Sequence, residues 1–382
     1  MQYIRTIFTY AAAVTLLLTI GVIAADTYTT LIEPAPSVSS NPKIETPARF
    51  VATTSDASSM TASAVKAADL ETVPLHSEMS TSSNNSTQKS PRQTAKPRIH
   101  NSSESGLDAV DARVRSALVN IQCFAGTRGV RSITASGVLI DSRGIILTNA
   151  HVAQHVLLSQ SPEINLDCYA YYGSPAHPLW NLEVLYVSPT WIKKHAGDIK
   201  KERSIGTGEF DYALLRVTNS TAGIPQSMIL PFLRFDTRSI PALPEDTVFV
   251  ASYPAEFVEK EEDLNALISI TSIQELLTFG DGAADVISVG GVAGAQSGSS
   301  GGALVDLSGR LLGIITTTSD SPTVSERDLR AISVHYVNKT LQRESGLDLQ
   351  TILHADLPTL AESFATNIAP ALIDLLVDAV KK

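Results

Sequence analysis

Short β-rich runs, separated by glycine, serine and aspartate, recur along most of the chain after residue 107. Runs of this length, with few helical patterns between them, are typical of antiparallel barrels and sandwiches. The stretch up to Gly346 is roughly 240 residues, which is enough for two packed barrels. We expect strands over residues 117–124, 133–140, 144–148, 164–172, 212–217, 247–252, 285–289, 303–305 and 311–317.

The first 25 residues have a different composition from the rest and carry one charged residue, Arg5. The uncharged stretch over residues 6–25 would span about 30 Å as a helix, enough to cross a bilayer core. The positive charge before it predicts that the remainder of the chain lies outside the cytoplasm, periplasmic or extracellular. A cleaved signal peptide is the alternative to a retained anchor, because small residues around Ala24 suit a signal peptidase, and the chain would then be secreted.

Residues 26–105 form a second compositional segment, in which 38 of 80 residues are Ser, Thr, Pro or Asn. Such a segment buries too little apolar surface to offset the entropy of ordering, so we expect a disordered linker. Its charges, together with Arg5, sum to zero, so the net charge of −10 belongs to residues 106–382. That acidic balance disfavours a nucleic-acid partner, which would need clustered Lys and Arg.

Three clusters of residues predict nucleophilic catalysis. His151 follows an apolar strand, Asp211 opens the apolar run Tyr-Ala-Leu-Leu-Arg-Val, and Ser300 lies in the turn Gln-Ser-Gly-Ser-Ser-Gly-Gly. A serine hydroxyl is a weak nucleophile and needs an adjacent base, whose tautomer a third group fixes. His151 is the candidate base, Asp211 the orienting carboxylate and Ser300 the nucleophile. Gly298 lets the backbone turn so that its N–H and that of Ser300 point at a developing oxyanion.

The order His, Asp, Ser, with Thr-Asn-Ala-His and Gly-Ser-Ser-Gly-Gly, resembles chymotrypsin-fold serine proteases. It is most similar to the trypsin-like catalytic domains of the bacterial HtrA/Deg type. The motifs Ala-Ser-Gly-Val-Leu-Ile at 135–140 and Val-Ala-Ser-Tyr-Pro at 250–254 support the resemblance, which covers about residues 110–340. It implies an all-β fold of two antiparallel six-stranded β-barrels and a serine endopeptidase that needs no metal and no cofactor.

The sequence also departs from that family. It has no Ile-Val-Gly-Gly start, and Ser299 stands before the nucleophile where the digestive branch has Asp, so no zymogen cleavage is implied. Only 36 residues follow Gly346, too few for the PDZ domain that usually follows an HtrA catalytic domain.

The resemblance also implies a primary substrate pocket. The residue six before the nucleophile, which often forms the pocket floor, is Gly294, so no carboxylate is available there to attract Arg or Lys. The strand at 314–318, with Thr316 and Thr317, would supply a wall and a main-chain edge for the substrate. We therefore expect cleavage after small or medium apolar residues in unfolded chains.

The same residues also fit other arrangements. Gly-Ser-Ser-Gly-Gly also satisfies the nucleophile motif of α/β-hydrolases, with His335 or His354 as base, but a β-like run and not a helix follows the serine. His155 lies four residues after His151, yet the Glu of the zinc motif is missing, so we expect His155 at the surface. The alternatives to Asp211 are Asp167 and Asp198, neither of which precedes a buried-strand pattern.

Two further features bear on the domain layout. Cys123 and Cys168 lie in predicted strands on either side of His151, and the sequence leaves open whether they form a disulfide or stay unpaired. Apolar residues at helical spacing predict a short C-terminal helix after Pro370 that docks on its own domain, although contacts with other copies or a membrane stay open.

These observations divide the chain into four parts: an anchor or signal peptide (1–25), a linker (26–105), a protease domain (106–345, with barrels at about 106–222 and 223–345) and a C-terminal helical extension (346–382). The sequence predicts a membrane-tethered extracytoplasmic serine endopeptidase that acts on polypeptides. The alternative is a catalytically silent protease-fold binding or scaffold protein. The physiological substrate, the oligomeric state and whether the oxyanion hole is formed at rest stay open.

Overall fold

The structure is a computed structural model and describes residues 102–201, 207–220, 229–256, 258, 264–280, 282–293, 295–317, 323 and 326–382. The predicted membrane segment and nearly all of the predicted linker lie outside the described residues. Helix α2 (Ser102–Ala117) begins within the last residues of that linker and runs directly into the first strand. The side chains of Val110, Val114 and Ala117 in α2 are buried, so this helix is part of the folded domain.

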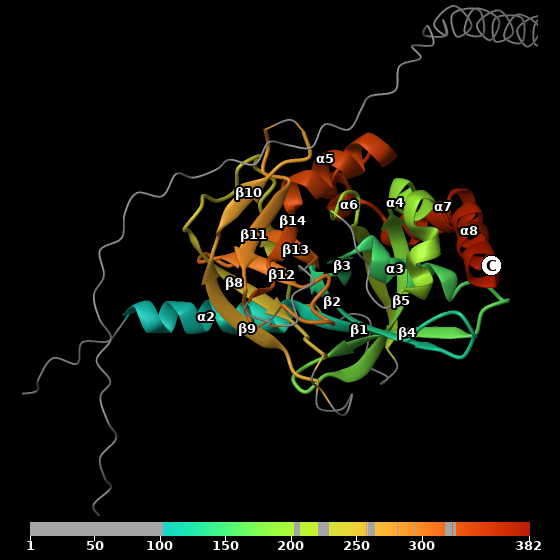
Figure 1. The fold of residues 1–382 in the computed structure, drawn as a ribbon, viewed down its shortest axis with the longest axis horizontal. Helices are drawn as coiled ribbons and strands as arrows, with labels where there is room; N and C mark the ends of the chain where they lie inside the picture. Colours follow the sequence, from blue (N-terminus) through green and yellow to red (C-terminus); the bar gives the residue numbers. More distant parts are fainter. Residues whose placement is uncertain are drawn as a thin grey trace, which may run out of the picture. The chain divides into compact units, whose positions relative to one another are not determined.

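Six antiparallel strands in the first half of the domain close into a barrel, as the sequence predicts (Figure 1). Pro178 and three register shifts in the pairing with its neighbours interrupt the alternating pattern of the longest strand, which explains why the sequence does not predict it. In spatial order the strands are β1 (Leu118–Ala125), β2 (Ile133–Leu139), β3 (Ile145–Thr148), β6 (Ala213–Ser220), β5 (His177–Val187) and β4 (Leu166–Tyr172).

The second half of the domain is a sheet of eight strands that forms a half-barrel, so the predicted second six-stranded barrel is confirmed only in part. The two strands at the ends of its path are joined by Ile273 and Gln274. Ile273 N donates to Asp246 O at 3.0 Å and Gln274 N to Ser288 O at 2.8 Å, so the connecting residues stay bonded on both sides. The path runs through β10 (Glu275–Leu277), β11 (Val286–Gly290), β14 (Leu329–Ser333), β13 (Arg310–Thr317), β12 (Ala303–Asp306), β8 (Thr247–Ser252) and β9 (Leu267–Ser272), with β7 (Arg234–Phe235) pairing parallel to β13.

The segment between the two halves is bonded to both. Leu233 N donates to Leu139 O of the barrel at 2.9 Å, and Asp236 N donates to Leu311 O of the second sheet at 2.9 Å. The connection therefore fixes how the barrel and the sheet meet.

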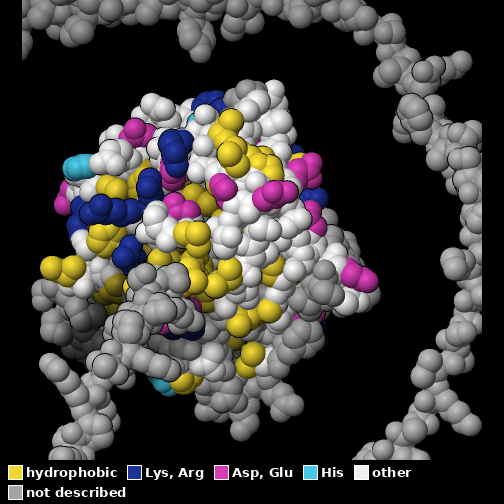
Figure 2. Space-filling view, turned by 90° about the vertical axis from the view of Figure 1, so that its left-hand side faces the viewer, with side chains coloured by type: hydrophobic (Ala, Val, Ile, Leu, Met, Phe, Trp, Pro, Cys, Tyr) yellow, Lys and Arg dark blue, Asp and Glu magenta, His cyan; other side chains and the backbone are white. Residues whose placement is uncertain are grey.

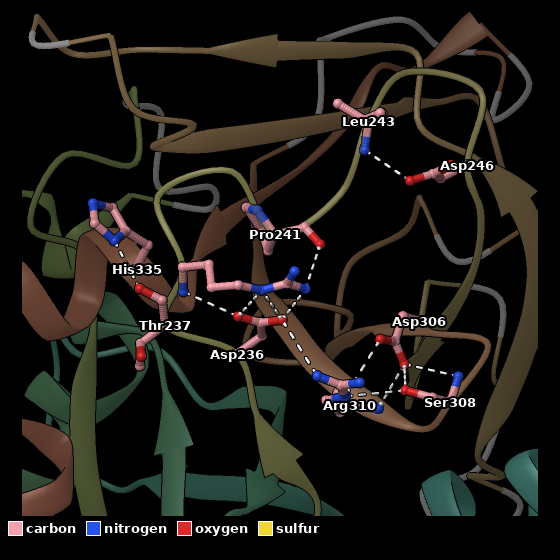
Figure 3. A network of polar contacts seen from close by, with 10 residues as sticks. Asp236, Thr237, Pro241, Leu243, Asp246, Asp306, Ser308, Arg310 and His335 are labelled. Atoms are coloured by element: carbon pink, nitrogen blue, oxygen red, sulfur yellow. Dashed lines mark hydrogen bonds and ion pairs between the residues drawn. The ribbon is translucent and has the colours of Figure 1, made fainter.

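A polar network around Asp236 strengthens this connection (Figure 3). The buried Asp236 carboxylate accepts hydrogen bonds from Arg238 Nε at 2.9 and 3.0 Å and lies 3.9 Å from Arg310 Nη1. The hydrogen bonds from Arg238 hold the pKa of Asp236 below its ordinary value. His335 lies in the helix that follows β14, and its Nδ1 donates to Thr237 O at 2.9 Å. This bond joins that helix to the same segment.

The C-terminal part contains more helix than the sequence predicts, because four helices follow β14 and the sequence predicts one. The last of them docks on the domain, packing against the helices on the outside of the barrel and burying Leu372, Leu376 and Val380 (Figure 1). The described helices after α2 are α3 (Ala150–Leu158), α4 (Pro189–His195) with the 3-10 turn η1 (Ala196–Lys200), α5 (Val334–Ser345), α6 (Leu349–His354), α7 (Leu357–Asn367) and α8 (Ala369–Lys381).

Within the part of the chain that the structure describes, no single helix has both the length and the hydropathy to cross a membrane; α7 and α8, bent by 55° at their junction, meet that criterion only as a pair. The face of the domain in Figure 2 carries basic and acidic side chains close together, with hydrophobic side chains scattered between them.

Candidate active site

The turn that carries Ser300 lies between β11 and β12 and depends on two glycines with positive φ. Gly298 has φ of +91°, and a Cβ there would lie 2.5 Å from Tyr253 O. Gly301 has φ of +81°, and a Cβ there would overlap Ser136 O. Other residues cannot adopt this backbone at this packing without strain, so the glycine-rich sequence is a requirement of the turn.

Ser136 on β2 of the barrel is bonded to both ends of this turn. Its N–H donates to Ser300 O at 2.7 Å, and its hydroxyl donates to Gly298 O at 2.8 Å while accepting from Tyr253 N at 2.8 Å. Ser136 is fully buried, so these hydrogen bonds form away from water. The Ser300 turn is thus held by a residue of the other half of the domain.

The N–H groups of Gly298 and Ser300 in this turn have no acceptor among the described residues. The N–H groups between and after them are bonded: Ser299 N donates to Gln296 O at 3.2 Å and Gly301 N to Ile315 O at 2.8 Å. The turn therefore presents the two donors that the sequence predicts for an oxyanion hole, with their neighbours engaged elsewhere.

His151 lies in the first turn of α3, where Asp211 meets it twice. Asp211 Oδ2 accepts from His151 Nδ1 at 2.7 Å, and Oδ1 accepts from His151 N at 2.9 Å. The second bond places a negative charge at the N-terminus of α3, whose N-cap residue Asn149 makes no side-chain capping bond. The Asn149 amide donates instead to Asp211 O at 2.9 Å. One carboxylate thus orients the imidazole and caps the helix that carries it.

Asp211 is 4% exposed and stays ionised because of its partners. Burial acts to raise its pKa, but the attraction and hydrogen bonds of His151, together with a 2.9 Å hydrogen bond from Thr316 Oγ1, outweigh burial and leave the pKa lowered. The ionised carboxylate holds the proton of His151 on Nδ1, which leaves Nε2 as the nitrogen available to take a proton.

The aromatic and helical surroundings hold these two residues in place. The ring of Trp191, which is buried, lies 6.5 Å from that of His151. Tyr212, next to Asp211 in the chain, donates to Glu344 of α5 at 3.2 Å, and Tyr186 donates to the same carboxylate at 2.6 Å. The C-terminal helices therefore support the strand that follows Asp211.

The alternative carboxylates do not contact His151. Asp198 accepts a 2.9 Å hydrogen bond from His195 Nδ1 and pairs with Lys201, while Asp167 is an exposed residue of β4. Of these three candidates, Asp211 alone reaches the histidine that the sequence selects.

The predicted pocket residues are only partly described. Gly294 and the side chain of Thr317 lie outside the described part of the structure. Thr316 is described and buried, and its hydroxyl points at Asp211, so its side chain supports the carboxylate. The sequence predicts Thr316 as a pocket wall and does not predict this contact. It also does not predict the hydrogen bonds of Ser136 and Asn149, although these two residues lie inside the motifs that support the family resemblance.

Cys123 and Cys168 form a disulfide, which settles the pairing that the sequence leaves open. They lie directly opposite each other on the antiparallel strands β1 and β4 of the barrel. The bond closes a loop across a sequence separation of 45 residues, and that loop contains His151.

The expectation that His155 lies at the surface is wrong. It is 4% exposed, and neither ring nitrogen has a hydrogen-bond partner among the described residues. Burial lowers its pKa to about 4, so it is neutral at physiological pH. Helix α3 packs between the barrel and α8, and His155 is one of its buried residues. No group of three or more metal-ligating side chains occurs within the described residues.

Part of the chain is similar to known proteins. Residues 135–314 match the family model of the trypsin-like peptidase domain. The Rv3671c protease from M. tuberculosis in its active form is 22% identical, with a TM-score of 0.41 over 62% of this chain and 84% of that chain. Its inactive form is 21% identical, with a TM-score of 0.40 over 62% of this chain and 93% of that chain. Comparison with curated protein sequences finds no match.

Proposed function

Because the chain is a serine peptidase with a trypsin-like peptidase domain over residues 135–314, we propose that His151, Asp211 and Ser300 are its catalytic triad. The observation that carries this proposal is the double contact between Asp211 and His151, at 2.7 Å and 2.9 Å. The Asp211 carboxylate is buried, accepts a hydrogen bond from Thr316 and is bonded to the backbone of His151 as well as to its ring. These features distinguish the pair from an ordinary ion pair at the surface.

In the proposed reaction, Ser300 Oγ attacks the carbonyl carbon of the scissile peptide bond while His151 Nε2 takes the hydroxyl proton. Asp211 stabilises the imidazolium that forms and remains ionised. His151 then gives its proton to the leaving amine, which departs and leaves an acyl group on Ser300. Water, deprotonated by the same imidazole, hydrolyses the acyl-enzyme and restores the serine.

The tetrahedral oxyanion of each step would be bound by the N–H groups of Gly298 and Ser300. Their lack of an acceptor among the described residues supports this role. Removing one such donor typically costs about 10²–10³-fold in kcat.

The cellular placement of this domain is proposed from the sequence. Residues 6–25 would anchor the chain in a membrane, with the peptidase outside the cytoplasm, and residues 26–105 would tether it at a distance. A flexible coil of that length has a root-mean-square span on the order of 50 Å. The substrates would be exposed or unfolded polypeptides with small or medium apolar residues before the scissile bond, because Gly294 offers no charge to a basic side chain.

Labelling with a fluorophosphonate probe tests the proposed nucleophile, because the probe bonds only to an activated serine. We expect the full chain to be labelled and the Ser300→Ala variant to be unlabelled. Labelling that persists in Ser300→Ala would exclude Ser300 as the nucleophile. A folded wild type that takes no label would favour a catalytically silent scaffold protein.

Two further measurements test placement and specificity. After cell fractionation, the full chain is expected with the membranes, and a chain without residues 1–25 is expected to be released from them.

A peptide library should show cleavage after small or medium apolar residues, and a profile dominated by Arg or Lys would refute the proposed pocket.

A further inference from the structure

A buried arginine outside the triad points to the Ser300 turn. Arg327 is 3% exposed, and its guanidinium forms two hydrogen bonds to the Glu256 carboxylate, at 2.6 Å and 2.8 Å. Its Nη1 also donates to Ala295 O at 2.8 Å. Charged side chains are almost never buried unless they are paired, and pairs with two parallel hydrogen bonds fix geometry well. This ion pair therefore joins three chain segments that are distant in the sequence.

The segment that carries Glu256 forms hydrogen bonds with both the carbonyl and the N–H of Ser297. Ala255 N donates to Ser297 O at 2.7 Å, and Ser297 N donates to Glu256 Oε2 at 3.3 Å. Arg327 fixes the Glu256 carboxylate that accepts the second bond and, through Ala295, the chain just before the turn. The position of Ser297 is thus set by the ion pair.

The orientation of one peptide group follows from these bonds. In a trans peptide the carbonyl oxygen and the N–H of the next residue point in opposite directions. Because Ser297 O points at Ala255 N, the Gly298 N–H points the other way, where the described residues offer it no acceptor. If the peptide rotated, this donor would leave the oxyanion hole.

We propose that the Glu256–Arg327 ion pair is a positioning device that holds the peptide between Ser297 and Gly298 in the orientation needed for the oxyanion hole. Neither residue touches the substrate's reacting atoms, and both act through Ser297. The inference rests on the proposed function, since it assigns a support to the same site.

The first test is the isosteric variant Glu256→Gln, which removes the charge and keeps the side-chain size. We expect kcat for a peptide from the library profile to fall about 10²-fold, the loss typical of one oxyanion donor, while KM changes little. The matched control is Glu183→Gln, which breaks a half-buried pair with Arg216 on the barrel, where Arg216 Nε donates to Glu183 Oε2 at 2.6 Å. Its kcat should equal that of the wild type.

A second measurement separates positioning from general loosening of the fold. A peptide aldehyde adds to Ser300 and places its oxygen in the oxyanion hole, whereas a non-cleavable peptide of the same sequence does not. In Glu256→Gln the affinity for the aldehyde should fall about 10²-fold relative to the affinity for the peptide. Equal losses for both ligands would overturn the proposal.

If Glu256→Gln does not fold, Arg327→Ala provides the same test with added guanidinium ion, which fits the space left by the side chain. Recovery of kcat on titration with guanidinium, absent with sodium at equal ionic strength, would support the proposal, and no recovery in folded protein would overturn it. A wild type that lacks activity would instead contradict the proposed function. An active wild type with an equally active Glu256→Gln would overturn this inference alone.

Discussion

The two halves of the domain hold their parts of the site by different means. The barrel is closed, carries the disulfide and brings His151 and Asp211 into direct contact. The second sheet is open, and the Ser300 turn is fixed by contacts from outside its own strands, from Ser136 and from Glu256. Under the proposed function, the barrel supplies a preformed base, whereas the geometry of the nucleophile turn depends on how several segments meet.

The largest expected effect is on the barrel side of the site. Asp211→Asn should lower kcat about 10⁴-fold, because the amide favours the wrong imidazole tautomer. Steady-state kinetics on a peptide substrate measures this. Asp198→Asn, which alters the neighbouring His195–Asp198 pair, is the control and should retain kcat. A loss of similar size in both variants would contradict the assignment.

The second effect concerns the stability of the barrel. Replacing both Cys123 and Cys168 with Ala should lower the free energy of unfolding by about 4 kcal/mol, the entropy expected for a loop of this length. Urea denaturation with and without reductant measures the difference. We expect kcat to be retained at a temperature where both proteins are folded. Equal urea midpoints would show that the disulfide does not stabilise the barrel.

The third effect is the pH dependence of stability contributed by His155. The folded chain protonates this residue only near pH 4, whereas the ordinary pKa is 6.5, so the unfolded chain binds more protons between these values. The free energy of unfolding should therefore fall as the pH drops from 6.5 to 4, by about 3 kcal/mol in total. Above pH 6.5 this contribution is constant.

Urea denaturation at pH 7 and pH 4.5 tests this with His155→Leu, which should lose much less stability on acidification than the wild type. The exposed His177→Gln serves as the control and should follow the wild type. Parallel losses in wild type and His155→Leu would contradict the burial of a neutral imidazole.

The smallest expected effect lies where the halves meet. Ser136→Ala leaves Gly298 O and Tyr253 N without their partner, and each unpaired buried group costs about 1–3 kcal/mol. If about 1.4–2.8 kcal/mol of that cost falls on the geometry of the turn, kcat should drop about 10- to 100-fold. Kinetics of Ser136→Ala against the exposed Ser132→Ala measures it, and an unchanged kcat would show that the turn keeps its shape without this contact.

The sequence predicts what depends on local pattern and misses what depends on tertiary contacts. Strands β1 to β4, β6, β8 and β11 to β13 follow from alternating or continuous apolar runs, and the motifs around His151 and Ser300 are local. Strand β5, with Pro178 and its register shifts, and the open second sheet depend on pairing that no local pattern encodes. The burial of His155 also depends on a distant element, since α8 covers the helix on which it lies.

The contacts around the nucleophile turn could not be predicted for the same reason. Glu256 and Arg327 are 71 residues apart, and a single sequence gives no sign that they pair. The place of Thr316 in the chain predicts a pocket wall, and only the fold shows that its hydroxyl faces Asp211.

The packing of α8 on α3 has a consequence for the timing of activity. The helix that carries His151 is covered by residues 369–381, which are synthesised after every member of the proposed triad. Because synthesis starts at the N-terminus, the nascent chain contains the proposed base and nucleophile before it contains α8, which supports the helix of the base. Full activity would then arise only once the C-terminal helices have docked, a delay that would spare the emerging chain and its neighbours from premature cleavage.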